Sequence, residues 1–294
     1  MRLFKDRLAH RTMLVLTAVP GLLVLLILAG LFLKAWPILA EKPFFSLLFS
    51  SAWGPNKGDF GLLPFLTGTL WVTAVALVLA GPVSLLTAIY LSEYAPRSVR
   101  EFTKPAIDLL AGLPSVIYGV WGVLLIVPFV SDIIAPLFGV HSSGYSVLAA
   151  GMVLAIMIFP TIISVSLEVF SSIPYELREA SLSLGATRWE TVRHVVMKKG
   201  AQGVIAAVVL GLSRAFGETF AVLMVVGNIP RVPGSVFAGG STLPTLIANN
   251  YGEMMSIPLY DSALMLAALV LLLVVLAFNI LARLILVRIE RRSA

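Results

Sequence analysis

The sequence predicts an all-α integral membrane protein with six membrane-spanning helices. Of its 294 residues, 59% are hydrophobic and 12% are charged, whereas soluble proteins carry about 25% charged residues. Six segments are long and apolar enough to cross a bilayer core, which takes about 20 residues of α-helix. A soluble domain of this size could not bury so much apolar surface, so we expect the bilayer to be its solvent.

The first three spans follow from charge-free runs. The first is residues 12–33, and because this run is longer than the about 7–15 apolar residues of a signal peptide, we expect a retained helix. The second is expected at residues 66–91, after a Gly- and Pro-containing start that delays the helix. The third is expected at residues 109–131, with a kink at Pro114.

The last three spans are expected at residues 146–167, 200–229 and 262–282. The fifth is apolar except for Arg214 and Glu218. Between the fifth and sixth spans lies an outer loop rich in Gly and Pro, in which residues 243–254 are expected to form a short interfacial helix.

The distribution of Lys and Arg predicts the orientation. Most of the 21 basic residues lie at the two chain ends and in the loops before the third and fifth spans. Loops rich in Lys and Arg stay in the cytoplasm, so we expect both termini there. Because the charge is spread over four membrane-adjacent segments, it does not indicate nucleic-acid binding.

These boundaries divide the chain into four parts. We expect a cytoplasmic N-terminal segment (1–11), a first membrane helix with its outer loop (12–60), a membrane core (61–288) and a cytoplasmic tail (289–294). The core contains a cytoplasmic loop at 171–199. The chain has no cysteine and its three histidines are scattered, so we expect no metal site, no catalytic group and no cofactor.

The cytoplasmic loop carries the most specific motif. A helix is expected at residues 175–184, then an interruption at Gly185 and a second helix at 187–197. The motif reads Glu179-Ala180-Ser181, three residues, Gly185, nine residues, then Val195-x-Met197. It resembles the cytoplasmic "EAA" loop of bacterial ABC importer permeases, whose pattern is Glu-Ala-Ala, three residues, Gly, nine residues, Ile-x-Leu-Pro. The spacing matches without a gap, although Ser181, Val195, Met197 and Lys198 depart from the pattern.

This resemblance implies a type I ABC importer permease bundle whose loop docks on an ATP-hydrolysing subunit. Glu179 would then face outward at the docking surface, and the small side chains of Ala180 and Ser181 would permit close approach. Gly185 would allow the chain to turn. The chain has no phosphate-binding loop of the G-x-x-x-x-G-K-[ST] kind, so ATP hydrolysis is expected from separate partner subunits.

Further segments resemble the phosphate-type members of that family. They are residues 112–119, 211–219 and 242–253. Of the two permease types that pair in this subfamily, the PstC type is the closer match and the PstA type the more distant. The resemblance implies a permease for inorganic phosphate in a bacterial or archaeal cytoplasmic membrane. Its partners would be a second permease, two ATPase subunits and an extracytoplasmic phosphate-binding protein.

Arg214 and Glu218 are the candidate residues of the substrate path. They lie four residues apart, which puts them on one face of a continuous helix. A charge in mid-span costs about 2.5–3.5 kcal/mol on insertion scales, so such residues face a cavity or a partner. Arg214 suits a phosphate oxyanion because its planar fork can bind bidentately, and Glu218 would keep that binding weak. The alternative is a purely structural ion pair.

Three other functions were compared with phosphate import. Sulfate or molybdate import would use the same machinery, with the choice of substrate left largely to the binding protein. An intramembrane enzyme would need a nucleophile and a base, but no span contains His or Cys, and Glu218 is the only acid deep in one. A passive channel would leave the cytoplasmic loop unexplained.

Overall fold

The computed structural model describes residues 2–253 and 256–293, which are almost entirely helical. Within these residues six helical segments are long and apolar enough to cross a membrane, which confirms the six predicted spans. They are Ala9–Glu41, Leu63–Tyr94, Ser115–Leu137, Val147–Ser172, Arg188–Gly217 and Tyr260–Ile285.

The first helix, α1 (Arg2–Glu41), runs past its predicted end and enters a compact connection at one end of the molecule. That connection consists of α2 (Phe44–Phe49), β1 (Trp53–Gly54), the 3₁₀ turn η1 (Pro55–Lys57) and β2 (Asp59–Phe60). The two strands pair antiparallel. Trp53 packs edge-on against Phe60 and Phe65, with ring centroids 5.9 and 5.0 Å apart, so this aromatic cluster closes the end of the bundle.

The second span is α3 (Leu63–Ile89), which ends in a π-helical turn, η2 (Tyr90–Tyr94). It is followed by α4 (Arg97–Gly112), a separate helix with charged residues along its length. The expected third span over residues 109–131 with a kink at Pro114 is therefore wrong. The helix stops at Gly112, and Leu113 is extended (φ −68°, ψ 135°), because the residue before a proline disfavours helical backbone.

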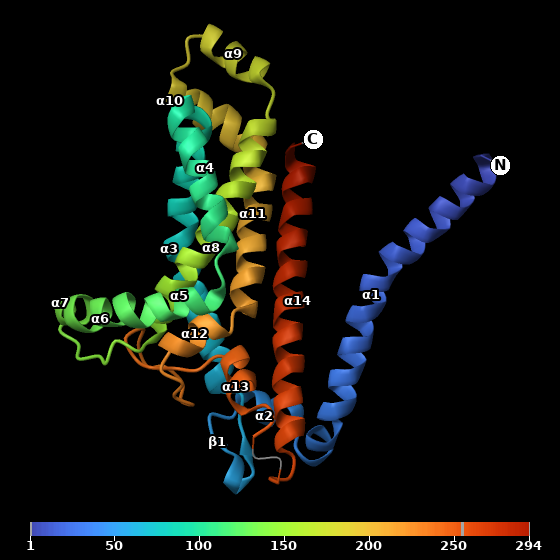
Figure 1. Cartoon of the computed structure of the whole chain (residues 1–294), viewed down its shortest axis with the longest axis vertical. Helices are drawn as coiled ribbons and strands as arrows, with labels where there is room; N and C mark the ends of the chain where they lie inside the picture. Colours follow the sequence, from blue (N-terminus) through green and yellow to red (C-terminus); the bar gives the residue numbers. More distant parts are fainter. Residues whose placement is uncertain (1, 254–255, 294) are drawn as a thin grey trace.

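The third span begins at Ser115 and is built from short helical pieces. These are α5 (Ser115–Trp121), η3 (Gly122–Ile126), α6 (Val127–Phe129), η4 (Val130–Ile134) and α7 (Ala135–Leu137), of which η3 and η4 are π-helical. In Figure 1 this row of helices runs sideways from the bundle.

The fourth span, α8 (Val147–Ser172), is the centre of the core and packs against α3. Its buried face is apolar and includes Leu154, Ile158 and Ile162. The contact with α3 is close at Gly151, where a Cβ atom would clash with the side chain of Val75. Small residues of this kind let membrane helices approach each other.

The fifth span differs from the prediction at both ends. The helix 187–197 expected within the loop is the beginning of the span itself, because α10 (Arg188–Thr191), the π-helical η5 (Val192–Val196) and α11 (Met197–Gly217) run on without a break. The expected end at residue 229 is also wrong. The helix stops at Gly217, Glu218 is extended (φ −73°, ψ 126°), and α12 (Phe220–Val225) follows as a separate piece.

The last outer loop contains the predicted short helix as α13 (Leu243–Asn250). Residue 254, the expected end of that helix, lies outside the described residues. The sixth span is α14 (Tyr260–Ser293). In Figure 1 both chain ends and the loop with α9 (Tyr175–Ser183) lie towards one end of the molecule, and β1, α2 and α13 lie at the other. An even number of spans requires the two termini to share a side in this way.

Candidate functional site

The loop helix α9 stands clear of the bundle at the end shared with the chain termini (Figure 1). It begins after Pro174, whose extended backbone (φ −55°, ψ 137°) precedes the first turn. Glu176 lies in that turn, where an acidic side chain stabilises the helix dipole. The helix predicted at residues 175–184 is therefore confirmed, with its last residue at Ser183.

The outer face of α9 is exposed. Glu179 and Ala180 lie in the solvent, and within the described part of the chain Glu179 forms no hydrogen bond or ion pair. Just beyond the helix, Leu184 is 90% exposed. An apolar side chain so exposed on a polar end of the molecule suits contact with another protein, but the docking role of Glu179 and Ala180 stays a prediction.

Gly185 ends α9 because of its backbone conformation. Its φ angle is +86°, and no heavy atom lies within 4 Å of where a Cβ would be. A side chain would fit in the available space, but its backbone would be strained. Two residues later a capping box starts α10, in which Thr187 and Glu190 satisfy each other's backbone N–H groups.

Ser181 has a partner that the sequence reasoning missed. Its hydroxyl lies 2.9 Å from the hydroxyl of Thr191 in α10, and Thr191 is only 4% exposed. The sequence did contain a signal, because Ser181 stands where the family pattern has alanine. An alanine side chain could not make this hydrogen bond.

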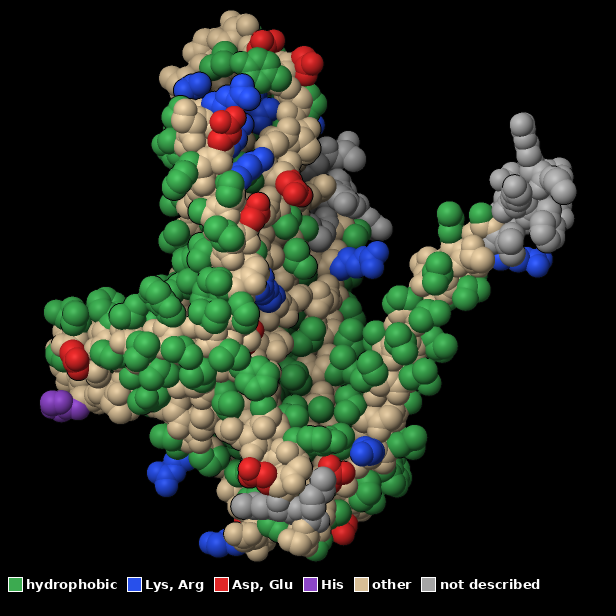
Figure 2. Space-filling view, in the orientation of Figure 1, with side chains coloured by type: hydrophobic (Ala, Val, Ile, Leu, Met, Phe, Trp, Pro, Cys, Tyr) green, Lys and Arg blue, Asp and Glu red, His purple; other side chains and the backbone are tan. Residues whose placement is uncertain are grey.

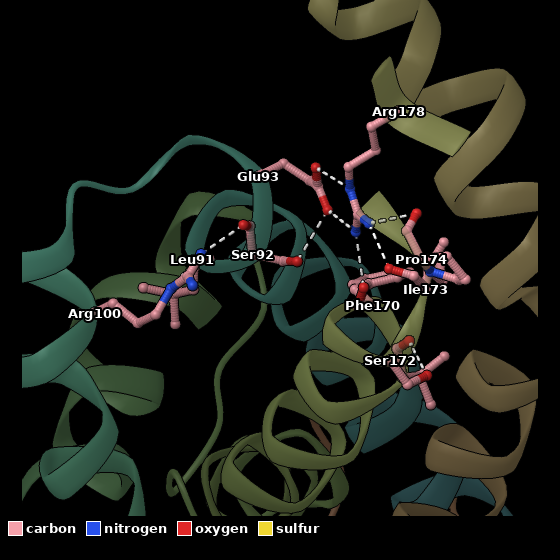
Figure 3. A network of polar contacts seen from close by, with 10 residues as sticks. Leu91, Ser92, Glu93, Arg100, Phe170, Ser172, Ile173, Pro174 and Arg178 are labelled. Carbon is pink, nitrogen blue, oxygen red and sulfur yellow. Dashed lines mark hydrogen bonds and ion pairs between the residues drawn. The ribbon is translucent and has the colours of Figure 1, made fainter. Parts of the chain in front are cut away.

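The neighbour of the motif, Arg178, points towards the bundle and was also missed. Figure 3 shows its guanidinium between Glu93 of η2 and the last carbonyl groups of α8. Nη2 lies 2.7 Å from Glu93 Oε1, and Nε donates to Glu93 Oε2 at 3.1 Å. The two residues line a cavity of about 730 Å³ between η2, α8, α9 and α10.

Arg214 lies in the last turn of α11 and is half-buried. Its Nη1 donates to Thr161 Oγ1 of α8 at 3.1 Å. The same turn lies beside the middle of α14, where the rings of Phe216 and Phe278 are 4.8 Å apart. The Arg214 side chain therefore lies where α11 contacts α8, at about the level of the middle of α14.

Arg214 and Glu218 do not share one face of a continuous helix, so the prediction from their four-residue spacing is wrong. The helix has ended at Gly217, so the i, i+4 geometry does not apply. Glu218 Oε1 instead accepts a hydrogen bond from the Ala221 N–H at 3.2 Å. Its carboxylate lines a small cavity whose other polar side chains are Thr69, Thr73 and Thr242. Among the residues whose side chains the structure describes, ion pairs join only Arg97 to Glu101 and Arg178 to Glu93.

A second set of polar side chains continues from Arg214 towards the end with α9. Thr161, Ser164 and Glu168 recur at spacings of three and four along α8, so they share a face. Together with Lys104 and Asp108 of α4, Ser164 and Glu168 line a cavity of about 220 Å³. Figure 2 shows blue and red side chains in a broken column over α4, α8 and α11, flanked by apolar side chains. The sequence reasoning used Lys104 only for orientation.

The sequence has clear relatives. Residues 84–294 match the family model described as "Binding-protein-dependent transport system inner membrane component". The phosphate transport system permease protein PstC of Xylella fastidiosa is 39% identical over 262 residues, covering 84% of this chain and 80% of that protein. PstC of Mesorhizobium japonicum is 36% identical over 306 residues, covering 98% and 92%.

Solved structures agree on the fold. A bacterial ABC transporter involved in the import of the acidic polysaccharide alginate contains a chain of 17% identity that matches with a TM-score of 0.65, over 98% of this chain and 99% of that chain. At this identity the likeness shows the fold alone. The family match spans well over half of the chain and includes both the loop motif and Arg214. The chain belongs to the family of binding-protein-dependent transport system inner membrane components.

Proposed function

We propose that this chain is a permease subunit of an ATP-driven importer for inorganic phosphate. The observation that carries the proposal is the likeness to two PstC permeases over 84% and 98% of this chain. Those proteins are named for phosphate transport, and the likeness extends through the span that holds Arg214. The chain would lie in the cytoplasmic membrane of its cell with both termini inside.

Arg214 is the residue that the anion would bind on its way through the membrane. A guanidinium carries five N–H donors, and within the described residues one of them is used, by Thr161. The remaining N–H groups can donate hydrogen bonds to the oxygens of a phosphate ion. The carbonyl groups at the end of α11 carry partial negative charge, which weakens anion binding at this turn. Weak binding suits a transport path, since the ion must leave as readily as it enters.

The polar face of α8 extends this path towards the end with α9. Between Arg214 and the end with α9, the cavity between α4 and α8 presents Lys104 together with Asp108 and Glu168. Two acidic groups and one basic group make this cavity negative, which favours release of an anion over its retention. Charged side chains in this position also require water or a partner chain on that face, and a second permease would close the path from the other side.

The helix α9 would be the contact with an ATPase subunit. It is exposed at the end shared by both termini and presents Glu179 outward, and Leu184 is exposed just beyond it. ATP hydrolysis by two such subunits would drive the conformational change, and a phosphate-binding protein on the opposite side would deliver the anion. The partners follow from the family, whose members depend on a binding protein.

Reconstitution of the importer tests this function. The complex that contains this chain is purified with its ATPase and second permease, placed in proteoliposomes and supplied with its binding protein. We expect uptake of labelled inorganic phosphate that requires ATP on the side of α9. Excess sulfate and molybdate should leave the uptake unchanged. Uptake without ATP, or import of sulfate or molybdate in place of phosphate, would contradict the proposal.

A further inference from the structure

The ion pair between Glu93 and Arg178 joins elements that are far apart in the sequence. The two residues are 85 positions apart, and their side chains are 11% and 12% exposed. Arg178 uses two nitrogens for Glu93. In the fork-like geometry that Arg forms with carboxylates, both the distance and the orientation of the partners are fixed.

The same guanidinium also holds the end of α8. Nη2 donates to the Phe170 carbonyl at 2.8 Å, and Nη1 donates to the Ile173 carbonyl at 2.7 Å (Figure 3). Carbonyl groups in the last turn of a helix lack partners within the helix. Arg178 therefore connects its own helix, α9, to the end of α8 and, through Glu93 in η2, to the end of the second span.

The neighbouring contacts fix both sides of this junction. Arg100 of α4 donates from Nε to the Leu91 carbonyl at 2.8 Å and from Nη2 to the Ser92 carbonyl at 2.5 Å, which holds the π-helical turn that carries Glu93. On its other side, α9 is bound to α10 through Ser181 and Thr191. Contacts on two sides oppose any shift of α9 relative to α3, α8 and α10.

We propose that Arg178 is a positioning residue that clamps α9 to the membrane helices, so that motion of α9 is transmitted to the substrate path. The Glu93–Arg178 clamp, together with the Phe170 and Ile173 carbonyls, makes a rigid connection between α9 and the two helices that pack together in the core, α3 and α8. Arg214 hydrogen-bonds to α8, so the connection ends at the proposed anion site. This inference rests on the proposed docking of an ATPase on α9.

The clamp predicts a change in coupling without a loss of assembly. Glu93→Gln keeps the shape of the side chain and removes its charge, while Arg178 retains its bonds to α8. Phosphate taken up per ATP hydrolysed should fall by about tenfold, within the range usual for coupling between sites. Arg178→Lys keeps the charge but loses the planar fork, and it should lower the same ratio. The matched control is Glu101→Gln, which breaks an exposed i, i+4 pair with Arg97 and should leave the ratio unchanged.

Uptake and hydrolysis are measured on the same proteoliposomes, so that only assembled complexes contribute to the ratio. A purely structural role would lower both rates together and leave the ratio at its wild-type value, which would overturn the clamp. If the wild-type complex shows no ATP-driven phosphate uptake, the proposed function itself fails, and this result is distinct from failure of the clamp.

A charge reversal tests the part played by the α8 carbonyls. In the double variant Glu93→Arg with Arg178→Glu, an ion pair between the two positions can form again. The carboxylate at 178 would then face the Phe170 and Ile173 carbonyls, which it cannot bind. We expect the coupling ratio to stay low in this variant. Recovery of the wild-type ratio would show that a simple ion pair suffices, and would overturn the three-element clamp.

Discussion

Arg214 combines a costly position with unused donors. A charged side chain at the centre of a membrane costs about 2.5–3.5 kcal/mol on insertion scales, and in the described structure Thr161 is its one hydrogen-bond partner. The Thr161 hydroxyl could be satisfied by a carbonyl group of its own helix at no such cost. The unused donors support the proposal that Arg214 binds the anion transiently.

Substitution of Arg214 separates charge from geometry. Arg214→Gln should abolish phosphate uptake, and Arg214→Lys should lower it about ten- to hundredfold, because each lost hydrogen bond to a charged group is worth about 1.5–3 kcal/mol. Uptake is compared at equal amounts of assembled complex. Arg97→Gln, the same change at an exposed arginine, serves as the control. Near-normal uptake by Arg214→Gln would mean that the residue does not meet the anion.

Gly185 offers a test at the coupling loop. Its φ angle of +86° costs an L-residue about 1–2 kcal/mol, but Asn tolerates this conformation better than other residues. We therefore expect phosphate uptake per ATP hydrolysed to fall severalfold in Gly185→Ala and less in Gly185→Asn. Gly81→Ala is the matched control, since Gly81 also has open space but no positive φ. If phosphate uptake per ATP hydrolysed is the same in the wild type and in Gly185→Ala, the turn at Gly185 has no part in coupling.

The sequence could identify single residues only where their signal was local. Arg214 was found because a charge interrupts an apolar run, and Glu179 and Gly185 because their spacing matches a pattern. The placement of Arg214 and Glu218 on one helix face was wrong because it assumed a continuous helix. The Glu93–Arg178 pair was out of reach, since nothing in the sequence relates two positions 85 residues apart.

At the scale of elements, the six spans were predictable because each needs a long apolar run. Their ends were not, because they depend on backbone details within such runs. The break at Leu113 was signalled by Pro114, although a kink was expected. No proline directly follows Gly217, so the sequence did not predict that the helix ends there. Conversely, the polar residues Lys198 and Lys199 suggested a boundary where the helix from Arg188 to Gly217 is continuous.

The contact between α9 and α10 can be measured by a double-mutant cycle. Ser181→Ala alone leaves the buried Thr191 hydroxyl without its partner, which costs about 1–3 kcal/mol, whereas replacing both groups by apolar ones can be nearly neutral. We expect the thermal stability of the complex to fall in Ser181→Ala and to recover in Ser181→Ala with Thr191→Val. Additive losses in the double variant would show that the two hydroxyls do not interact.

At the scale of the whole molecule, the two ends of the bundle are chemically different. The end with α9 holds both termini and the polar network around Arg178, and the opposite end holds the aromatic cluster around Trp53 (Figure 1). Aromatic side chains are typical of the membrane–water interface. The uneven distribution of Lys and Arg predicts that the α9 end faces the cytoplasm.

This orientation can be tested without background because the chain contains no cysteine. Single cysteines are placed at exposed positions in three places: Lys57→Cys in η1, Ser183→Cys in α9 and His10→Cys near the start of α1. In intact spheroplasts a membrane-impermeant thiol reagent should label Lys57→Cys. It should reach Ser183→Cys and His10→Cys only after the membrane is permeabilised, since both lie towards the end of the bundle that we expect to face the cytoplasm. Equal labelling of all three after permeabilisation controls for side-chain access. Labelling of Ser183→Cys in intact spheroplasts would show that the molecule has the opposite orientation in the membrane, with α9 on the side that lacks ATP. Labelling of His10→Cys together with Lys57→Cys, but not of Ser183→Cys, would instead show that α1 does not cross the membrane, which would leave five spans and put the two termini on opposite sides.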